Sequence, residues 1–236
     1  MKLCVIPARG GSKRIPRKNI RDFCGKPMIS YSITAAINCG LFDKVMVSTD
    51  DEEIADTAEK FGAEVPFMRS PENSDDYSGT GDVVHEVISE YESRGICFHT
   101  ACCVYATAPL IRAKRLHEAY DLLIQEGYDV VFPVCRYASS IWRSYRVNEQ
   151  GTAEMNFAKF NSYRSQDLPI SYFDAGQFYW LYPSKLKELK NKNTFGITKG
   201  ALVLQEYEVQ DIDCPTDWAI AEMKYSKLDL LQPRES

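Results

Sequence analysis

Lys2-Leu3-Cys4-Val5-Ile6-Pro7-Ala8-Arg9-Gly10-Gly11-Ser12-Lys13-Arg14-Ile15-Pro16-Arg17-Lys18-Asn19 opens the chain, directly after Met1. A short apolar run is followed at once by a loop with two glycines and five basic side chains. Glycines let backbone N–H groups approach an anion closely, and Arg and Lys neutralise its charge. The pattern predicts a buried strand over Lys2–Ile6 that leads into a polyphosphate-binding loop. A charged loop that is merely solvated is the alternative interpretation.

Positive charge is concentrated in this opening segment of an otherwise acidic chain. Eight of the 28 Lys and Arg residues lie in the first 26 residues, together with one of the 33 acidic residues, and the formal net charge is −5. A local cationic site in a net-negative protein favours a small anionic ligand over nucleic acid or an anionic membrane. No apolar run approaches the roughly 18 residues that span a bilayer, and Pro7 and Arg9 interrupt the only short apolar run at the N-terminus. We therefore expect a cytoplasmic protein without a signal peptide.

Cysteine and histidine show no pattern of a metal site or of nucleophilic catalysis. None of the eight cysteines forms a Cys-x-x-Cys pair, so reduced thiols are expected. His85, His99 and His117 lack the spacing of a catalytic triad or of a metal site. No Gly-x-Ser-x-Gly elbow is present, so the sequence favours direct transfer assisted by a metal and by positive charge.

Strand and helix signals alternate over the first 135 residues. The candidate strands there are Lys2–Ile6, Lys44–Ser48, Glu64–Met68, Thr100–Tyr105 and Asp129–Val134. Apolar residues at helical spacing mark helices between them, and Trp218, Ala221, Tyr225 and Leu228 mark a closing helix. Gly176–Tyr182 is predicted as a further strand, and Ala201–Asp211 as one or two more. This order predicts an α/β fold in one domain over residues 1–236, with a three-layer, Rossmann-like, mainly parallel sheet. Ligands of such sheets bind beyond the carboxyl ends of the strands, where the basic loop falls.

The alternation stops between Arg136 and Ser171. This stretch places several aromatic side chains among polar residues, a content that is too aromatic for a disordered loop. The composition predicts an inserted arm over residues 136–171 that packs on a second subunit, and hence a homodimer.

A pair of carboxylates near the end of the chain is the second candidate site. Asp211 and Asp213 are two residues apart, and an extended backbone turns both side chains to the same side. Mg²⁺ commonly uses one or two carboxylates together with substrate phosphates. The alternative is a structural one, in which Asp213 is an ordinary turn acid and Thr216 or Asp217 caps the last helix. The metal interpretation gains weight only beside a phosphate loop.

Three segments resemble one known family in the same order along the chain. Ile6-Pro-Ala-Arg-Gly-Gly-Ser-Lys-x-x-x-x-Lys-Asn19 resembles the opening of the CMP-sialic acid synthetases, which belong to the cytidylyltransferases that activate acidic keto-sugars. Tyr105-Ala-Thr-Ala-Pro-Leu110 and Asp211-Ile-Asp213 resemble two further motifs of this family. The run Arg164-Ser-Gln-Asp-Leu-Pro-x-x-Tyr172-x-Asp-Ala-Gly-Gln-Phe-Tyr-Trp180 is similar to the pseudaminic acid cytidylyltransferases, which serve bacterial flagellin glycosylation.

The resemblance implies CTP, Mg²⁺, an acidic nine-carbon keto-sugar and a domain-swapped dimerisation arm. The nucleotide-binding residues that it implies are Ala8, Arg9, Gly10, Gly11, Ser12, Lys13, Lys18 and Asn19, with Arg69 and Thr80 near the cytosine. It implies catalytic roles for Arg9, Lys13, Lys18 and Asp211, and a metal site at Asp211 and Asp213. The implied sugar-binding residues are Tyr105, Arg164, Gln166, Asp174 and Gln177, with Arg164 on the sugar's carboxylate. Departures from the sialate enzymes at Tyr105, Ile111 and 174–176 disfavour N-acetylneuraminate itself.

The expected reaction is pseudaminate plus CTP giving CMP-pseudaminate plus diphosphate, by in-line attack of the sugar's anomeric hydroxyl on the α-phosphorus. No residue stands out as its general base. Legionaminate, N-acetylneuraminate and Kdo remain alternative sugars, and a non-catalytic nucleotide-sugar binding protein is an alternative of another class. A sugar-1-phosphate nucleotidyltransferase is disfavoured, because the chain lacks a Gly-x-Gly-Thr-Arg loop.

Overall fold

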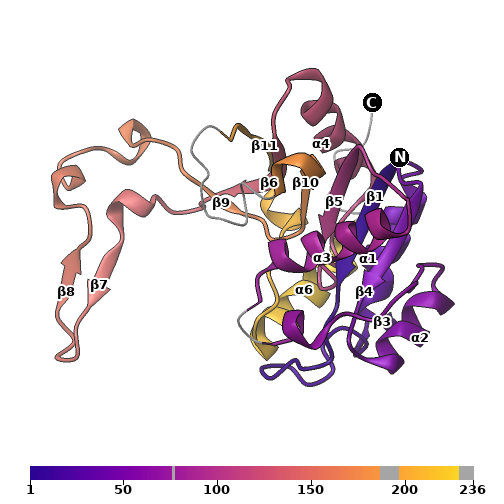
Figure 1. Ribbon diagram of the computed structural model, residues 1–236. Helices are drawn as coiled ribbons and strands as arrows, with labels where there is room; N and C mark the ends of the chain where they lie inside the picture. The colour runs from indigo at the N-terminus through magenta and orange to yellow at the C-terminus, as the bar shows by residue number, and fades with distance from the viewer. Residues whose placement is uncertain (76–77, 187–196, 229–236) are drawn as a thin grey trace.

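A seven-stranded sheet forms the centre of the molecule in a computed structural model that describes residues 1–75, 78–186 and 197–228 (Figure 1). Six strands lie in the order β11-β6-β10-β5-β1-β4, and β9 pairs with β6 outside this path. The strands are β1 (Lys2–Pro7), β4 (Lys44–Ser48), β5 (Thr100–Val104), β6 (Val130–Arg136), β9 (Tyr172–Asp174), β10 (Phe178–Leu181) and β11 (Lys199–Leu204).

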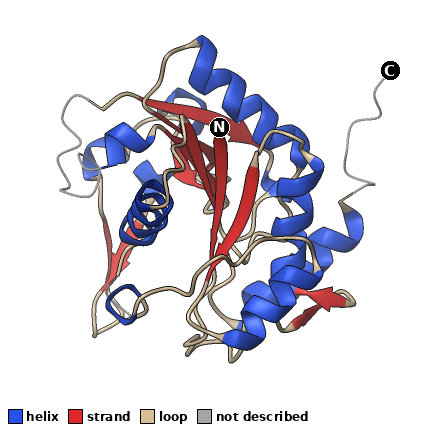
Figure 2. Cartoon of the chain, turned by 45° about the vertical axis from the view of Figure 1, so that its right-hand side comes forward, coloured by secondary structure: helices blue, strands red, loops and turns tan. Residues whose placement is uncertain are grey.

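Helices cover both faces of this sheet (Figure 2). They are α1 (Met28–Asn38), α2 (Glu52–Lys60), α3 (Thr80–Ser93), α4 (Ala113–Gln125) and α6 (Pro215–Lys227). Alternate residues of β1 enter different cores: Cys4 and Ile6 pack with α1 and α4, whereas Leu3 and Val5 pack with α3. This arrangement confirms the predicted α/β class and its three layers.

The prediction of a mainly parallel sheet is confirmed only in part, because β9 and β10 run opposite to the other strands and the sheet is mixed. β1 runs parallel to β4 and β5, and β11 runs parallel to β6. β10 is antiparallel to both of its neighbours, and β9 is antiparallel to β6. β9 and β10 run in the same direction along one side of β6, with only three residues between them, so the chain that returns from the arm pairs with β6 in the antiparallel sense. Short apolar runs predict strands but do not fix their direction.

The predicted strand over Glu64–Met68 is also wrong, apart from one bridge to β4. The backbone N–H of Glu64 donates to Val45, and the carbonyl of Glu64 accepts from Val47. A continuing parallel strand would next donate from residue 66, which is a proline without an N–H group. Within Ala201–Asp211 only β11 forms a strand, and residues Glu206–Glu208 form a 3₁₀ turn instead.

The chain between β6 and β9 leaves the body and projects as an arm (Figure 1). Its tip is a small hairpin of β7 (Tyr145–Val147) and β8 (Ala153–Met155), and the rest is loop with short 3₁₀ turns at Ile141–Arg143, Ala158–Phe160 and Ser165–Asp167.

A second small hairpin, β2 (Asp22–Phe23) with β3 (Lys26–Pro27), follows the opening loop. All eight cysteines are free thiols, as predicted. None of the helices within the described residues is long and apolar enough for a bilayer crossing.

Candidate active site

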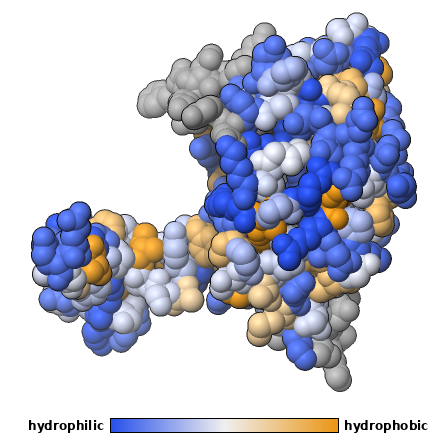
Figure 3. Space-filling model, turned by 90° about the horizontal axis from the view of Figure 1, so that it is seen from below, coloured by the Kyte–Doolittle hydropathy of each residue, from blue (hydrophilic) through white to orange (hydrophobic). Residues whose placement is uncertain are grey.

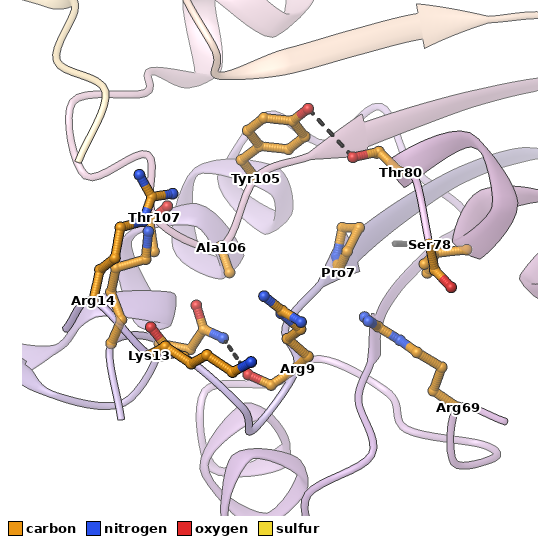
Figure 4. Close-up of a pocket in the computed structure, with 14 residues that line it drawn as sticks. Pro7, Arg9, Lys13, Arg14, Arg69, Ser78, Thr80, Tyr105, Ala106 and Thr107 are labelled. Atoms are coloured by element: carbon orange, nitrogen blue, oxygen red, sulfur yellow. Dashed lines mark hydrogen bonds between the residues drawn. The ribbon is translucent and has the colours of Figure 1, made fainter. Parts of the chain in front are cut away.

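A cavity of about 440 Å³ lies beyond the carboxyl end of β1 (Figure 4). It is lined by Pro7, Arg9, Ser12, Lys13, Arg14, Lys18, Asn19, Arg69, Ser78, Thr80, Val83, Tyr105, Ala106 and Thr107. Arg9, Lys13 and Arg69 direct their charged ends into this space from different parts of the chain. We call it the nucleotide cavity below, because most of the predicted nucleotide-binding residues meet here.

The opening loop owes its shape to two acidic residues after β4 that the sequence analysis missed. Asp50 accepts a hydrogen bond from the backbone N–H of Gly10 at 2.9 Å. Asp51 caps α2 through the N–H of Ile54 and accepts both arms of the Arg17 guanidinium, which lowers the pKa of its carboxyl. Arg17 is thereby committed to a structural pair, at a positive φ of 54°.

Gly10 is required at its position because the chain passes close to Asp51. A Cβ at Gly10 would lie 2.6 Å from Asp51 Oδ2, whereas a Cβ at Gly11 would meet nothing within 4 Å. Asn19 closes the loop from the inside, donating from Nδ2 to the Arg9 carbonyl at 2.9 Å. Asn19 is buried, so this hydrogen bond sets the direction of the Arg9 backbone.

Lys18 joins the two candidate sites. Its Nζ donates to the backbone carbonyl of Ile212 at 2.7 Å, between Asp211 and Asp213. Burial lowers the pKa of Lys18, and the charges of Asp213 and Asp211 oppose that shift. The phosphate loop and the carboxylate pair therefore meet in space, although 194 residues separate Lys18 from Ile212.

A small hydrophobic cluster explains this convergence. Ile15 and Phe23 from the opening segment pack with Ile212 and with Trp218 of α6, and Ile212 is 0% exposed. The extended backbone buries Ile212, so its two neighbours turn away from the cluster. Cys214 is the N-cap residue of α6, and Asp217, the third residue of the helix, completes a capping box by accepting from the N–H groups of residues 213 and 214. The capping interpretation is thus correct for Asp217 and leaves Asp211 and Asp213 outside the cap.

The two carboxylates suit a hard cation. Desolvation raises the pKa of Asp211, and the neighbouring charge of Asp213 raises it further, as expected for two acids that share a site. Arg14 forms an ion pair with Asp213 at 2.7 Å. Both carboxylates line a neighbouring acidic cavity of about 380 Å³ that also contains Lys224. Across the described ranges, no three His, Cys, Asp or Glu side chains are grouped to hold a metal, so this pair would depend on substrate phosphates as further ligands.

The far wall of the nucleotide cavity holds Arg69 and Thr80. Arg69 is 8% exposed, and its Nε donates to Ser48 Oγ at 3.0 Å. Burial lowers its pKa, against the attraction of Asp50. Thr80 Oγ1 lies 3.3 Å from the hydroxyl of Tyr105, and this contact forms the upper edge of the cavity (Figure 4).

Behind that contact lies a second, mostly apolar cavity of about 270 Å³, which we call the adjoining cavity. It is lined by Thr80, Gly81, Val84, Cys103, Tyr105, Val130, Phe132, Asp174, Tyr179, Leu181 and Lys199. Tyr179 donates its hydroxyl to Asp174 at 2.8 Å. Thr80 and Tyr105 line both cavities, so the two spaces share a wall. Tyr179 and Lys199 were not predicted as site residues: Tyr179 stands in the run from Arg164 to Trp180 without an assigned role there, and Lys199 stands in no recognised motif.

Three predicted sugar-binding residues lie elsewhere. Gln177 is 3% exposed, and its Nε2 donates to the Glu208 carbonyl at 2.5 Å, so its side chain lines neither cavity. Arg164 and Gln166 lie on the arm. Arg164 is mostly exposed and pairs with Asp167. Tyr105 and Asp174 are the predicted sugar-binding residues that the structure brings together.

Comparison with known proteins identifies the family of the chain. Residues 3–214 match the family model described as Cytidylyltransferase. A pseudaminic acid cytidylyltransferase of Campylobacter jejuni is 43% identical over 94% of this chain and 95% of its own length. A CMP-N,N'-diacetyllegionaminic acid synthase of Legionella pneumophila is 34% identical over 93% and 94%. The structure of a CMP:2-keto-3-deoxy-manno-octonic acid synthetase complexed with CTP is 18% identical and shares the fold, with a TM-score of 0.72 over 98% of this chain and 99% of that one. The match over residues 3–214 and the identity to these relatives show that the chain belongs to the cytidylyltransferase family.

Proposed function

We propose that this protein transfers CMP from CTP to pseudaminate and releases diphosphate, with Mg²⁺ as the metal. One observation carries the proposal: Lys18 of the cationic loop contacts the backbone between Asp211 and Asp213. A nucleotidyl transfer needs cations for the triphosphate and carboxylates for the metal at the same nucleotide. The 43% identity to a pseudaminic acid cytidylyltransferase supports the choice of sugar.

Different residues of the nucleotide cavity are proposed to bind different parts of CTP. Arg9, Lys13 and Lys18 neutralise the triphosphate. Arg69 and Thr80 border the end of the cavity proposed for the cytosine. Asp211 and Asp213 would hold Mg²⁺, whose charge polarises the α-phosphate when it is bound.

The adjoining cavity is proposed to hold the sugar, because it shares Tyr105 and Thr80 with the nucleotide cavity. Its apolar walls suit a sugar whose substituents include methyl groups, and Asp174 and Tyr179 supply the polar contacts. The anomeric hydroxyl attacks the α-phosphorus in line and diphosphate leaves, without a covalent intermediate on the protein. Positioning and electrostatic stabilisation supply the rate enhancement.

The arm is proposed to form a homodimer. Its exposed large hydrophobic side chains are Tyr137, Tyr145, Val147, Tyr163 and Ile170. The separate lobe of Figure 3 carries a few orange patches on a mostly blue surface. A projecting segment with such a surface gains stability when a second copy covers it. Arg164 lies on the same segment, so we propose that it reaches the sugar's carboxylate in the partner's site.

A panel of sugars tests the function. Purified protein is incubated with CTP, Mg²⁺ and one sugar at a time, and released diphosphate is measured for pseudaminate, legionaminate, N-acetylneuraminate and Kdo. We expect the highest kcat/KM with pseudaminate. A higher value with another of these sugars would contradict the choice of sugar but keep the chemistry. CTP binding with no diphosphate from any sugar would contradict the enzyme and favour a nucleotide-sugar binding protein.

A further inference from the structure

A buried ion pair lies behind the segment that carries Asp211 and Asp213. Glu208, which is 2% exposed, stands three residues before Asp211. Arg115 of α4, whose side chain is 24% exposed, donates from Nε to Glu208 Oε1 at 2.9 Å and from Nη2 to Oε2 at 2.8 Å. Its Nη1 also pairs with the more exposed Glu118 at 2.6 Å. Neither Arg115 nor Glu208 lines the nucleotide, adjoining or acidic cavity. Any influence of this pair on substrates must therefore pass through other residues.

Stability alone is a weak explanation for this pair. Taking two charges out of water offsets most of their attraction, and apolar replacements of similar volume are often neutral or stabilising. Burial opposes ionisation of Glu208, but the hydrogen bonds from Arg115 and from the Gln205 N–H outweigh it, and the pKa of Glu208 is lowered. The lowered pKa favours the ionised carboxylate, and two hydrogen bonds from Arg115 fix the geometry of the pair, which is what a positioning contact requires.

The backbone of Glu208 extends this contact to the wall between the two cavities. Its carbonyl accepts from Gln177 Nε2 at 2.5 Å, and the carbonyl of Gln177 accepts from the Tyr105 N–H at 2.8 Å. Through Glu208, Arg115 is thus linked to Tyr105 in the wall between the cavities. It is also linked to residues 205–213, the stretch that carries Asp211 and Asp213, which we call the carboxylate segment.

Lysine side chains hold the carboxylate segment elsewhere through its backbone carbonyls. After β11 ends at Leu204, Lys224 of α6 donates to the carbonyls of Glu206 at 3.0 Å and Val209 at 2.7 Å. Lys18 then holds the Ile212 carbonyl. A segment outside the sheet has no ladder of backbone hydrogen bonds to define its path, so these contacts define it.

We propose that Arg115 and Glu208 are positioning residues that hold Asp211 and Asp213 at the distance from Lys18 that a shared nucleotide requires. The inference rests on the proposed function, since it assigns the pair to that reaction. Displacements of about 1 Å at reacting groups cost on the order of 10²-fold in rate. Residues that orient metal ligands typically matter by about 10–100-fold in metal affinity or activity.

The test replaces both charges at once with the double variant Arg115→Met/Glu208→Met, which leaves no unpaired buried charge. Its matched control is Lys44→Met/Glu64→Met, which removes an ion pair at the start of β4. We measure kcat, KM for CTP and the half-saturating Mg²⁺ concentration. We also measure thermal unfolding, and by calorimetry the gain in CTP affinity that Mg²⁺ confers in the absence of sugar.

We expect the double variant to unfold cooperatively near the wild-type temperature. Its kcat should fall about 10–100-fold, its Mg²⁺ requirement should rise by a similar factor, and the calorimetric gain from Mg²⁺ should shrink. The CTP affinity measured without Mg²⁺ should change little, because the loop over residues 9–19 is untouched. The control pair should leave all of these values at wild-type levels.

Arg115→Lys is a second, milder variant that keeps the test possible if the double variant fails to fold. It keeps the positive charge and loses only the planar guanidinium fork. We expect it to fold and to show a smaller loss of the same kind. Wild-type kcat and Mg²⁺ dependence in either folded variant would overturn the inference. If wild-type protein released no diphosphate with any sugar, the proposed function would fail, whereas the calorimetric comparison would still decide whether the pair positions the metal ligands.

Discussion

At the scale of single residues, Lys18 is where the two halves of the site meet. Its ammonium group has protein partners before any substrate arrives: the Ile212 carbonyl and the charges of Asp211 and Asp213. These partners hold the side chain at the edge of the nucleotide cavity. A preorganised cation of this kind stabilises developing negative charge without reorganising during the reaction.

Replacing Lys18 with alanine should therefore lower kcat/KM by about 10²–10³-fold, which corresponds to roughly 3–4 kcal/mol of transition-state stabilisation. Diphosphate release with CTP and pseudaminate measures the effect. Lys26→Ala removes the same charge from an exposed position on β3 and should leave turnover unchanged. Turnover of Lys18→Ala near that of Lys26→Ala would refute the assignment.

The sequence allowed prediction of those site residues that share a local motif. Arg9, Lys13 and Lys18 stand on one loop directly after a buried strand, a pattern that predicts a phosphate site, and the structure brings all three to one cavity. The supporting acids could not be predicted, because Asp50 lies 40 residues from its partner Gly10. Nothing in a single sequence indicates such a distant pairing.

At the scale of elements, the sequence predicted which runs form strands better than how those strands run. β1, β4 and β5 were predicted almost to the residue, since uninterrupted apolar runs mark strands that are buried on both faces. The direction of β10 depends on the excursion of the arm before it, and the lost strand near Glu64 depends on a hydrogen bond that Pro66 cannot make. Both depend on tertiary context that the apolar pattern does not encode.

The loop between β1 and α1 offers a test of local packing, with two adjacent glycines that differ only in their surroundings. Gly10→Ala would drive a Cβ against the fixed side chain of Asp51, with contacts of 2.6 Å to Oδ2 and 3.0 Å to Cβ. Overpacking of this kind typically costs about 1–3 kcal/mol. We expect Gly10→Ala to lower the free energy of unfolding by that amount, as measured by chemical denaturation.

Gly11→Ala is the matched control, because its Cβ would enter open space at a negative φ. The free energy of unfolding should change by less than about 1 kcal/mol, in either direction. Equal destabilisation by both substitutions would show that the contact with Asp51 does not shape the loop.

At the scale of the whole molecule, the arm separates residues that the proposed reaction brings together. Arg164 lies on the projecting segment, where its described partner is Asp167, while Lys18 lies in the body. In a symmetric dimer each arm can serve only the same site on the other copy, because an isologous interface repeats every contact. The proposed dimer would therefore build each of its two sites from both chains.

Mixing two defective proteins tests this arrangement directly. Arg164→Ala and Lys18→Ala should each have low activity as homodimers. When the two are unfolded together in equal amounts and refolded, half of the dimers contain one chain of each kind. If Arg164 serves the partner's site, each mixed dimer has one site with both defects and one intact site, and the mixture regains about a quarter of wild-type activity. If Arg164 serves its own chain, every site keeps one defect and mixing restores nothing.

Sedimentation of the mixture confirms that dimers have formed. A dimer that gains no activity would remove Arg164 from the partner's site, and a monomer with full wild-type activity would remove the arm from the reaction altogether.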